Sequence, residues 1–203
     1  MNLSPNILAK LDQPEQILDL DLDWQLVKQW EQEAFTHFPD LRAFSKLEGL
    51  SLSSHQISKL HKSFFPTSLE RLDLSYNLLE HCKDFGFLPN LKSLDLSFNE
   101  VYDPKGLENL NTLEVLHLSH NQVENIRALD SLSRLRTLGL SGNRRIQDWK
   151  SISRLTSLKI LYVKQLYGMT WDILEHLSDL EELYISFRRA DKIPSFFTLK
   201  QLH

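Results

Sequence analysis

A leucine-rich segment recurs about every 22 residues along most of the chain, and this period restricts the folds that the chain can adopt. The first clear unit reads Leu-Glu-Gly-Leu-Ser-Leu over residues 47–52, and each later unit begins 22 residues after the one before it, or once 23. A unit of this length cannot bury its own leucines, so consecutive units must stack and share one continuous core. The units begin at Leu47, Leu69, Leu91, Leu113, Leu135, Leu158 and Leu180.

Two features inside each unit predict its local structure. The Leu-x-Leu alternation predicts a short strand with one buried face. In the four middle units an asparagine comes three residues after the last leucine, where its amide can bond backbone groups as the chain leaves the strand. The single 23-residue interval includes residues 143–146, so we expect a loop one residue longer there. The asparagines are Asn77, Asn99, Asn121 and Asn143.

The full L-x-x-L-x-L-x-x-N-x-L pattern resembles that of leucine-rich-repeat proteins and covers about residues 41–203, preceded by a predicted N-terminal cap over residues 1–40. The 22-residue period is similar to the short intracellular subclass that protein-phosphatase-1 regulatory subunits typify. The resemblance implies an α/β solenoid curved as a horseshoe, with parallel strands on its concave face and short helical or irregular turns on its convex face. It also implies two biological settings, a eukaryotic regulatory subunit or a small bacterial effector or effector regulator.

The N-terminal end of the array needs a cap, because stacked repeats leave an open end on each side. Residues 17–22 repeat the strand pattern once more, and Asp23 precedes apolar residues at helical spacing, which predicts a strand followed by a helix that Asp23 caps. We interpret Trp24 and Trp30 as part of this cap, although they could instead form a stripe that binds a partner.

The C-terminal end is less regular. Leu202 lies 22 residues after Leu180 and matches the approach to an eighth unit, but the sequence stops before we expect a strand to form. Two interpretations remain open, a truncated eighth unit or a small cap made by residues 193–203.

Side chains that leave the strands toward the concave face are the candidates for function. Asp73 and Asp95 are expected on neighbouring strands, about 5 Å apart, and like charges at that spacing call for a cation or for Lys or Arg of a partner. Aromatic residues beside them favour a protein interface, the alternative being that Tyr76 and Phe98 only cover the strand turns. The predicted partner-binding residues are Asp73, Tyr76, Asp95, Phe98, His117, His120, Tyr162, Lys164, Tyr184 and Phe187.

The sequence offers no pattern for catalysis, a metal ion or a cofactor. Serines recur after the last leucine of successive units without a base beside them, which indicates a structural role. Cys82 beside His81, and His117 near His120, supply too few ligands for a zinc site. A phosphate-binding glycine loop is missing as well. We therefore expect a chain that is not an enzyme, has no metal site and needs no cofactor.

Charge and cysteine content restrict the classes of partner and the cellular compartments that we expect. The net charge of −4 argues against binding to nucleic-acid phosphates. The sequence shows neither the roughly 20 apolar residues of a membrane helix nor a secretory signal. Its single cysteine cannot form an internal disulfide. We expect no membrane insertion and a location in the cytoplasm, or in a host cytoplasm for a secreted bacterial effector.

These observations predict a protein–protein interaction module that binds a folded partner on its concave face and acts as a regulator or adaptor, including a bacterial effector or effector regulator. The alternatives are the substrate-recognition arm of a larger enzyme such as a ubiquitin ligase, or a phosphatase regulatory subunit. The sequence leaves the oligomeric state open.

Overall fold

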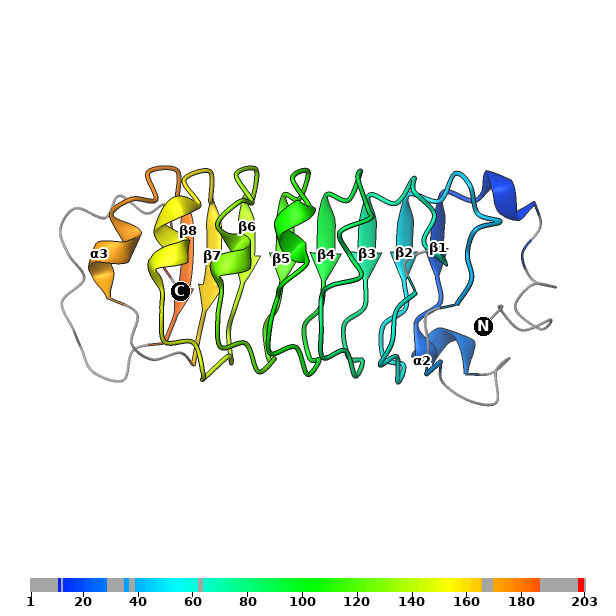
Figure 1. Cartoon of the computed structure of the whole chain (residues 1–203), viewed down its shortest axis with the longest axis horizontal. Coiled ribbons are helices and arrows are strands. Elements are labelled where there is room, and N and C mark those ends of the chain that lie inside the picture. Colours follow the sequence, from blue (N-terminus) through cyan, green and yellow to red (C-terminus); the bar gives the residue numbers. More distant parts are fainter. Residues whose placement is uncertain are drawn as a thin grey trace.

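The computed structural model of the chain is a single open sheet of nine parallel strands that follow one another in sequence order (Figure 1). It describes residues 11, 13–28, 35, 36, 39–61, 64–165, 170–186, 201 and 202. This architecture confirms the predicted repeat solenoid. The strands are β1 (Asp19–Asp21), β2 (Gly49–Ser51), β3 (Arg71–Asp73), β4 (Ser93–Asp95), β5 (Val115–His117), β6 (Thr137–Gly139), β7 (Ile160–Val163), β8 (Glu182–Ile185) and β9 (Gln201–Leu202).

The strand register places equivalent leucines of successive units opposite one another. Leu50 pairs with Leu72, and Leu72 pairs with Leu94, so the buried side chains form one continuous core along the stack. The longer loop after Asn143 leaves this register intact, because Leu138 still pairs with Leu161. The extra residue is therefore absorbed in the loop, as the sequence predicts.

Short helical turns lie on the side of the core opposite the strands. In Figure 1 the helical turns of the middle units lie at the strands that they precede. Three-residue turns suffice there because each unit has only to return the chain to the next strand, and two of these turns bury one leucine each, Leu107 and Leu129. The helical segments are η1 (Pro14–Gln16), α2 (Trp24–Val27), η3 (Leu107–Asn109), η4 (Arg127–Leu129), η5 (Lys150–Arg154) and α3 (Trp171–Leu174).

The four asparagines form a buried stack that we call the asparagine ladder (Asn77, Asn99, Asn121 and Asn143). Each amide joins two units: Asn99 Nδ2 donates to the carbonyl oxygens of Leu74 at 2.9 Å and Leu96 at 3.1 Å, and Asn99 Oδ1 accepts from the N–H of Leu79 at 2.9 Å. These backbone groups lie inside the turn, away from water, so their hydrogen bonds must come from the protein. The ladder therefore confirms the role predicted for the asparagines.

His55 extends this ladder toward the N-terminus, a role that the sequence pattern did not reveal. Its Nδ1 accepts from the N–H of Phe35 at 3.0 Å, and its Nε2 lies 2.7 Å from the carbonyl oxygen of Leu22. The two contacts match those of an asparagine, and they require a neutral ring with its hydrogen on Nε2. The imidazole also stacks on Phe35, with ring centroids 4.5 Å apart, and Trp24 tilts against its ring at 5.7 Å.

The N-terminal strand β1 lies within the predicted residues 17–22, and the helix begins directly after Asp23 as predicted. Asp23 precedes α2, and its Oδ1 accepts from the N–H of Gln25 at 2.6 Å, which is the expected helix cap. Trp24 is partly buried and packs against the core, which supports its assignment to the cap over the alternative of a free partner-binding stripe. Trp30 lies outside the described residues.

The prediction that no strand forms at the C-terminus is wrong. β9 pairs with β8, and Leu202 is opposite Leu183, the second leucine of its unit. A strict 22-residue count places Leu202 at the position equivalent to Leu180, but the strand pairing places it at the position equivalent to Leu183. Leu199 lies three residues earlier, at the interval that separates the first and second leucines of the other units, so the last unit is shorter than the rest.

Two further properties of the described chain bear on its chemistry. Cys82 is fully buried, and this burial is the main reason that the pKa of its thiol is raised far above the ordinary value. Every helix among the described residues is too short to span a bilayer.

Candidate functional site

The site is built on the strand face, which we define as the outward surface of β1–β8 and the turns directly after them; it is the face predicted to be concave. Three rings from successive turns stack on this face, and we call them the aromatic ladder (Tyr76, Phe98 and His120). Ring centroids are 4.2 Å apart from Tyr76 to Phe98 and 4.4 Å apart from Phe98 to His120, with interplanar angles of 7° and 11°. Tyr76 is 53% exposed and Phe98 39%, so the ladder presents apolar area to solvent.

The three residues of the aromatic ladder have backbone conformations in the left-handed region. The φ angles are 54° at Tyr76, 57° at Phe98 and 55° at His120, a region that bulky residues seldom adopt. Each N–H still donates to the next unit, for example from Tyr76 to the carbonyl oxygen of Ser97 at 2.9 Å. These residues therefore lie in the turn after each strand, and the ladder results from repeating the same strained turn.

A second group of rings, the strand row (His117, Tyr162 and Tyr184), lies on the strands themselves. Tyr162 and Tyr184 stack at 4.4 Å, and the ring of His117 lies 6.0 Å from that of Tyr162, with β6 between them. Lys164 Nζ lies 5.5 Å from the centroid of Tyr184, within cation–π range. The Tyr184 hydroxyl donates to Glu182 at 3.0 Å, and this bond to a carboxylate is the main cause of a raised pKa for Tyr184.

Two glycines of one unit allow both groups of rings to adopt these positions, and the sequence analysis did not single them out. A Cβ atom on Gly139 would lie 2.7 Å from His117 Nδ1, and one on Gly142 would lie 2.8 Å from His120 Nδ1. Both imidazoles therefore lean over the space that the glycines leave open. The signal was present in the sequence, because Gly139 and Gly142 occupy the same positions in their unit as His117 and His120 in the preceding one.

Asp73 and Asp95 lie side by side on β3 and β4 as predicted. Each uses Oδ1 to accept the N–H of the residue two positions later, Ser75 and Ser97 respectively, at 2.8 Å. Among the described residues no cation lies within ion-pair distance of either carboxylate. The pKa of Asp73 is raised, mainly by burial and further by the charges of Asp95 and Asp23, while its hydrogen bonds to Ser75 oppose the rise.

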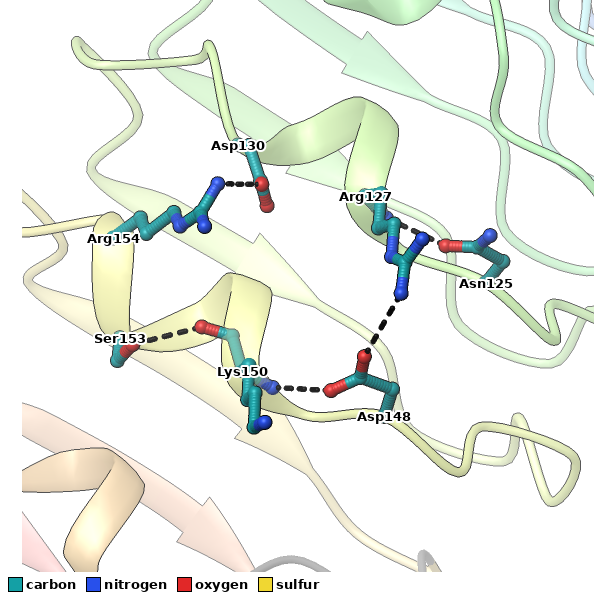
Figure 2. A network of polar contacts seen from close by, with 7 residues as sticks. All are labelled: Asn125, Arg127, Asp130, Asp148, Lys150, Ser153 and Arg154. Carbon is teal, nitrogen blue, oxygen red and sulfur yellow. Dashed lines mark hydrogen bonds and ion pairs between the residues drawn. The ribbon is translucent and has the colours of Figure 1, made fainter.

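Ion pairs join neighbouring units elsewhere on the described chain. Where the chain enters the strands, Lys92 bonds Glu70 at 2.8 Å and Lys159 bonds Glu181 at 3.0 Å. Ion pairs also join neighbouring units on the opposite face, where Arg127 of η4 lies 3.7 Å from Asp148 and Arg154 of η5 bonds Asp130 (Figure 2). The adjacent carboxylates of Asp73 and Asp95 take part in no ion pair among the described residues.

The longer loop creates a separate polar groove of about 660 Å³. Its arginines are largely paired, since Arg145 bonds Glu124 at 3.0 Å and Arg127 contacts Asp148. Because carboxylates and guanidinium groups alternate along it, the groove is a weaker candidate than the strand face. It is lined by Glu124, Asn125, Arg127, Arg144, Arg145, Gln147 and Asp148.

The structure thus brings the predicted site residues into two groups, the acids with the aromatic ladder and the strand row with Lys164. Phe187 lies outside the described residues. His117 and His120 both belong to the site, but the described part of the chain gathers no three side chains of the kinds that bind metal ions. Chemically, these two groups of predicted residues offer ring surfaces, two carboxylates and one lysine.

Comparison with known families agrees with the repeat geometry. A sequence model described as "Leucine rich repeat" matches residues 45–101, and one described as "Leucine Rich repeats (2 copies)" matches residues 111–154. The chain is a leucine-rich-repeat protein. A search among curated protein sequences gave no significant match to this leucine-rich-repeat protein.

Solved structures of other leucine-rich-repeat proteins are similar to it. Internalin C2 (inlC2) from Listeria monocytogenes is 25% identical with a TM-score of 0.73, and the match covers 86% of this chain and 76% of that one. An internalin (inlF) from the same organism is 25% identical with a TM-score of 0.67, over 80% of this chain and 49% of that one, so the chain spans about half of that protein. TLR13, in a complex with ssRNA13, shares the fold at 23% identity and a TM-score of 0.70, over 91% of this chain and 32% of that one.

Proposed function

We propose that this leucine-rich-repeat protein is an interaction module that binds a folded protein partner on its strand face. The observation that carries the proposal is the pair of ring groups on that face, the aromatic ladder and the strand row. Stacked rings left in water expose apolar area that association would bury, and tyrosines are frequent anchors of protein interfaces. Tyr76 and Phe98 are the large apolar side chains of these groups that are exposed.

A protein partner fits the face better than a nucleic acid does. Asp73 and Asp95 carry negative charge beside the rings and have no cation near them in the described structure. Phosphates would be repelled by these carboxylates, whereas a polypeptide can supply a compensating side chain.

The role that we propose is that of a regulator or adaptor, not of an enzyme, acting in the cytoplasm or in a host cytoplasm. The single cysteine, which is buried and has no second cysteine to pair with, supports a reducing compartment. The similarity to two internalin structures from a bacterium favours the effector-type setting over a phosphatase regulatory subunit.

Affinity capture from a lysate tests the proposal, with bound proteins identified by mass spectrometry. The bait is the wild-type chain or a variant carrying Tyr162→Ala and Tyr184→Ala, with Phe187→Ala as an added change. A matched control carries Tyr102→Ala, since Tyr102 is 43% exposed and contacts His81 away from the strand face.

We expect one protein to be retained by the wild type and by the Tyr102→Ala control and lost from the strand-face variant. Each anchor tyrosine should contribute about 2 kcal/mol or more, about 30-fold in affinity. Equal recovery with all three baits, while the variant keeps its circular-dichroism spectrum and melting temperature, would contradict the proposal.

A further inference from the structure

The N-terminal half of the strand face presents an aromatic surface with one unstacked side. Tyr76 is the first ring of the aromatic ladder, and Phe98 provides its only ring contact among the described residues. The equivalent position in the preceding unit is Ser54, whose side chain is too small to cover the ring, and Tyr76 remains 53% exposed. A flat group of a partner can therefore stack on Tyr76 and continue the ladder by one step.

The negative charge beside this surface indicates which chemical group of a partner would bind there. Asp73 lies three residues before Tyr76 and Asp95 three residues before Phe98, on neighbouring strands about 4.8 Å apart. A backbone N–H donates to Oδ1 of each side chain, and the side chain of Ser75 also hydrogen-bonds the carboxylate of Asp73. A carboxylate can accept about four hydrogen bonds, so both side chains can still accept from a partner. No cation of the described chain lies within ion-pair distance of them, whereas Lys92, Arg136 and Lys159 each pair with an acidic residue of a neighbouring unit at the strand entrances.

We propose that the aromatic ladder docks a segment of the protein partner that presents an arginine, whose guanidinium stacks on the open side of Tyr76 and donates to Asp73, while the charge of Asp95 one strand further on adds to the attraction. Guanidinium is planar, stacks on aromatic rings and carries five donors in a fixed fork, so it can contact a ring and donate to a carboxylate at once. A lysine ammonium is a compact point charge and cannot do both equally well. This inference rests on the proposed function and names the chemistry of the partner that the strand face selects.

A peptide titration tests the inference without knowledge of the natural partner. The probes are three capped peptides, acetyl-Gly-Arg-Gly-amide, acetyl-Gly-Lys-Gly-amide and acetyl-Gly-Glu-Gly-amide, titrated into the isotope-labelled full chain and followed by NMR. The arginine peptide should shift resonances of Tyr76 and Phe98 and leave those of Tyr162 and Tyr184 unchanged. The lysine peptide should bind at least about threefold more weakly, and the glutamate peptide should cause no shift at these rings.

Variants separate the carboxylates from general electrostatics. The double change Asp73→Asn and Asp95→Asn keeps the side-chain shapes and should weaken the arginine peptide at least about tenfold. Glu100→Gln removes one negative charge at an exposed position outside the ladder and should leave the affinity unchanged. Retained affinity in the double variant, equal affinity for the lysine peptide, or shifts confined to other regions would each overturn the inference.

The two experiments can fail independently, because the capture experiment alters Tyr162 and Tyr184 whereas the titration reports on Tyr76. A captured partner together with an arginine peptide that does not bind would remove the inference and leave the function standing. An arginine peptide that binds at Tyr76 without any strand-face partner would remove the proposed function instead.

Discussion

The asparagine ladder and the aromatic ladder use adjacent residues of the same turns, yet they differ in almost every property. Asn99 is buried and joins two units, whereas Phe98 beside it is exposed and contacts rings of neighbouring units. The inward position must donate to backbone carbonyl oxygens and accept one N–H at fixed distances, which an amide or a neutral imidazole can do. The outward position has no such demand. One column of the repeat is thus fixed by the fold, and its neighbour is free to specify a partner.

The largest difference between the ladders should appear in a pair of alanine variants. Asn99→Ala leaves the buried N–H of Leu79 without its side-chain partner and removes one of the two amides that donate to the carbonyl oxygen of Leu74, so we expect a loss of about 3 kcal/mol in the free energy of unfolding. Phe98→Ala removes exposed ring area and should cost less than about 1 kcal/mol. Urea unfolding followed by circular dichroism measures both. Similar losses in the two variants would show that the aromatic ladder also holds the fold.

His55 tests whether the inward position requires asparagine-like chemistry. His55→Ala should cost about 2 kcal/mol, because the N–H of Phe35 and the carbonyl oxygen of Leu22 lose their partner. His55→Asn can rebuild both hydrogen bonds and should cost less than about 1 kcal/mol, the remainder reflecting the lost stacking on Phe35. Thermal unfolding compares the two variants. If asparagine were as harmful as alanine, the stacking and not the hydrogen bonds would be the main contribution of His55.

Glycine substitutions probe the point where the aromatic surface meets the backbone. Gly142 has φ 79°, and an alanine there is strained and also displaces His120, so we expect a loss of about 1 to 2 kcal/mol. Gly139→Ala displaces His117 without the same backbone strain and should cost less than about 1 kcal/mol. The unfolding free energy and the NMR shifts of each imidazole report the two effects. Equal losses would mean that ring displacement, not backbone conformation, sets the cost.

The smallest effect should be a gain in stability. Because the pKa of Asp73 is raised in the folded protein, its proton binding stabilises the fold below the ordinary carboxyl pKa, and this contribution disappears as the pH rises through the raised pKa. Asp73→Asn removes the buried negative charge and should add up to about 0.5 kcal/mol at pH 7. The gain should shrink as the pH falls through the raised pKa and the wild-type carboxyl takes up its proton. A loss of stability at pH 7 would show that the charge of Asp73 is compensated within the fold.

The sequence predicts the strands and the asparagine ladder because both depend on periodicity, and Leu72 or Asn99 has the same task in every unit. It also predicts that Asp73 and Asp95 lie side by side. Alternation states only whether a residue faces in or out, however, and it contains no information on the left-handed turn at Tyr76. Ring stacking and the space over Gly142 depend on that turn and on side-chain torsions. The position of His55 in the ladder was missed because a search for asparagine does not consider other side chains with a donor and an acceptor.

The error at the C-terminus has a similar origin. A constant period assigns Leu202 to the first leucine position, but the pairing of β9 with β8 places Leu202 opposite Leu183, the second leucine of its unit. Leu199 and Leu202 have the spacing of the first two leucines of a unit, which fits this pairing with a shorter interval. A fixed count of 22 residues therefore does not set the register of the last strand.

The buried thiol of Cys82 can report how often the repeats open transiently. As the only cysteine in the chain, it gives a single, unambiguous adduct with any thiol reagent, and it lies in the middle units, between β3 and β4. A reagent reaches it only while those units are transiently apart, so the rate of labelling counts such events. With a partner bound on the strand face, the labelling rate of Cys82 would show how far binding slows the transient opening of the repeats.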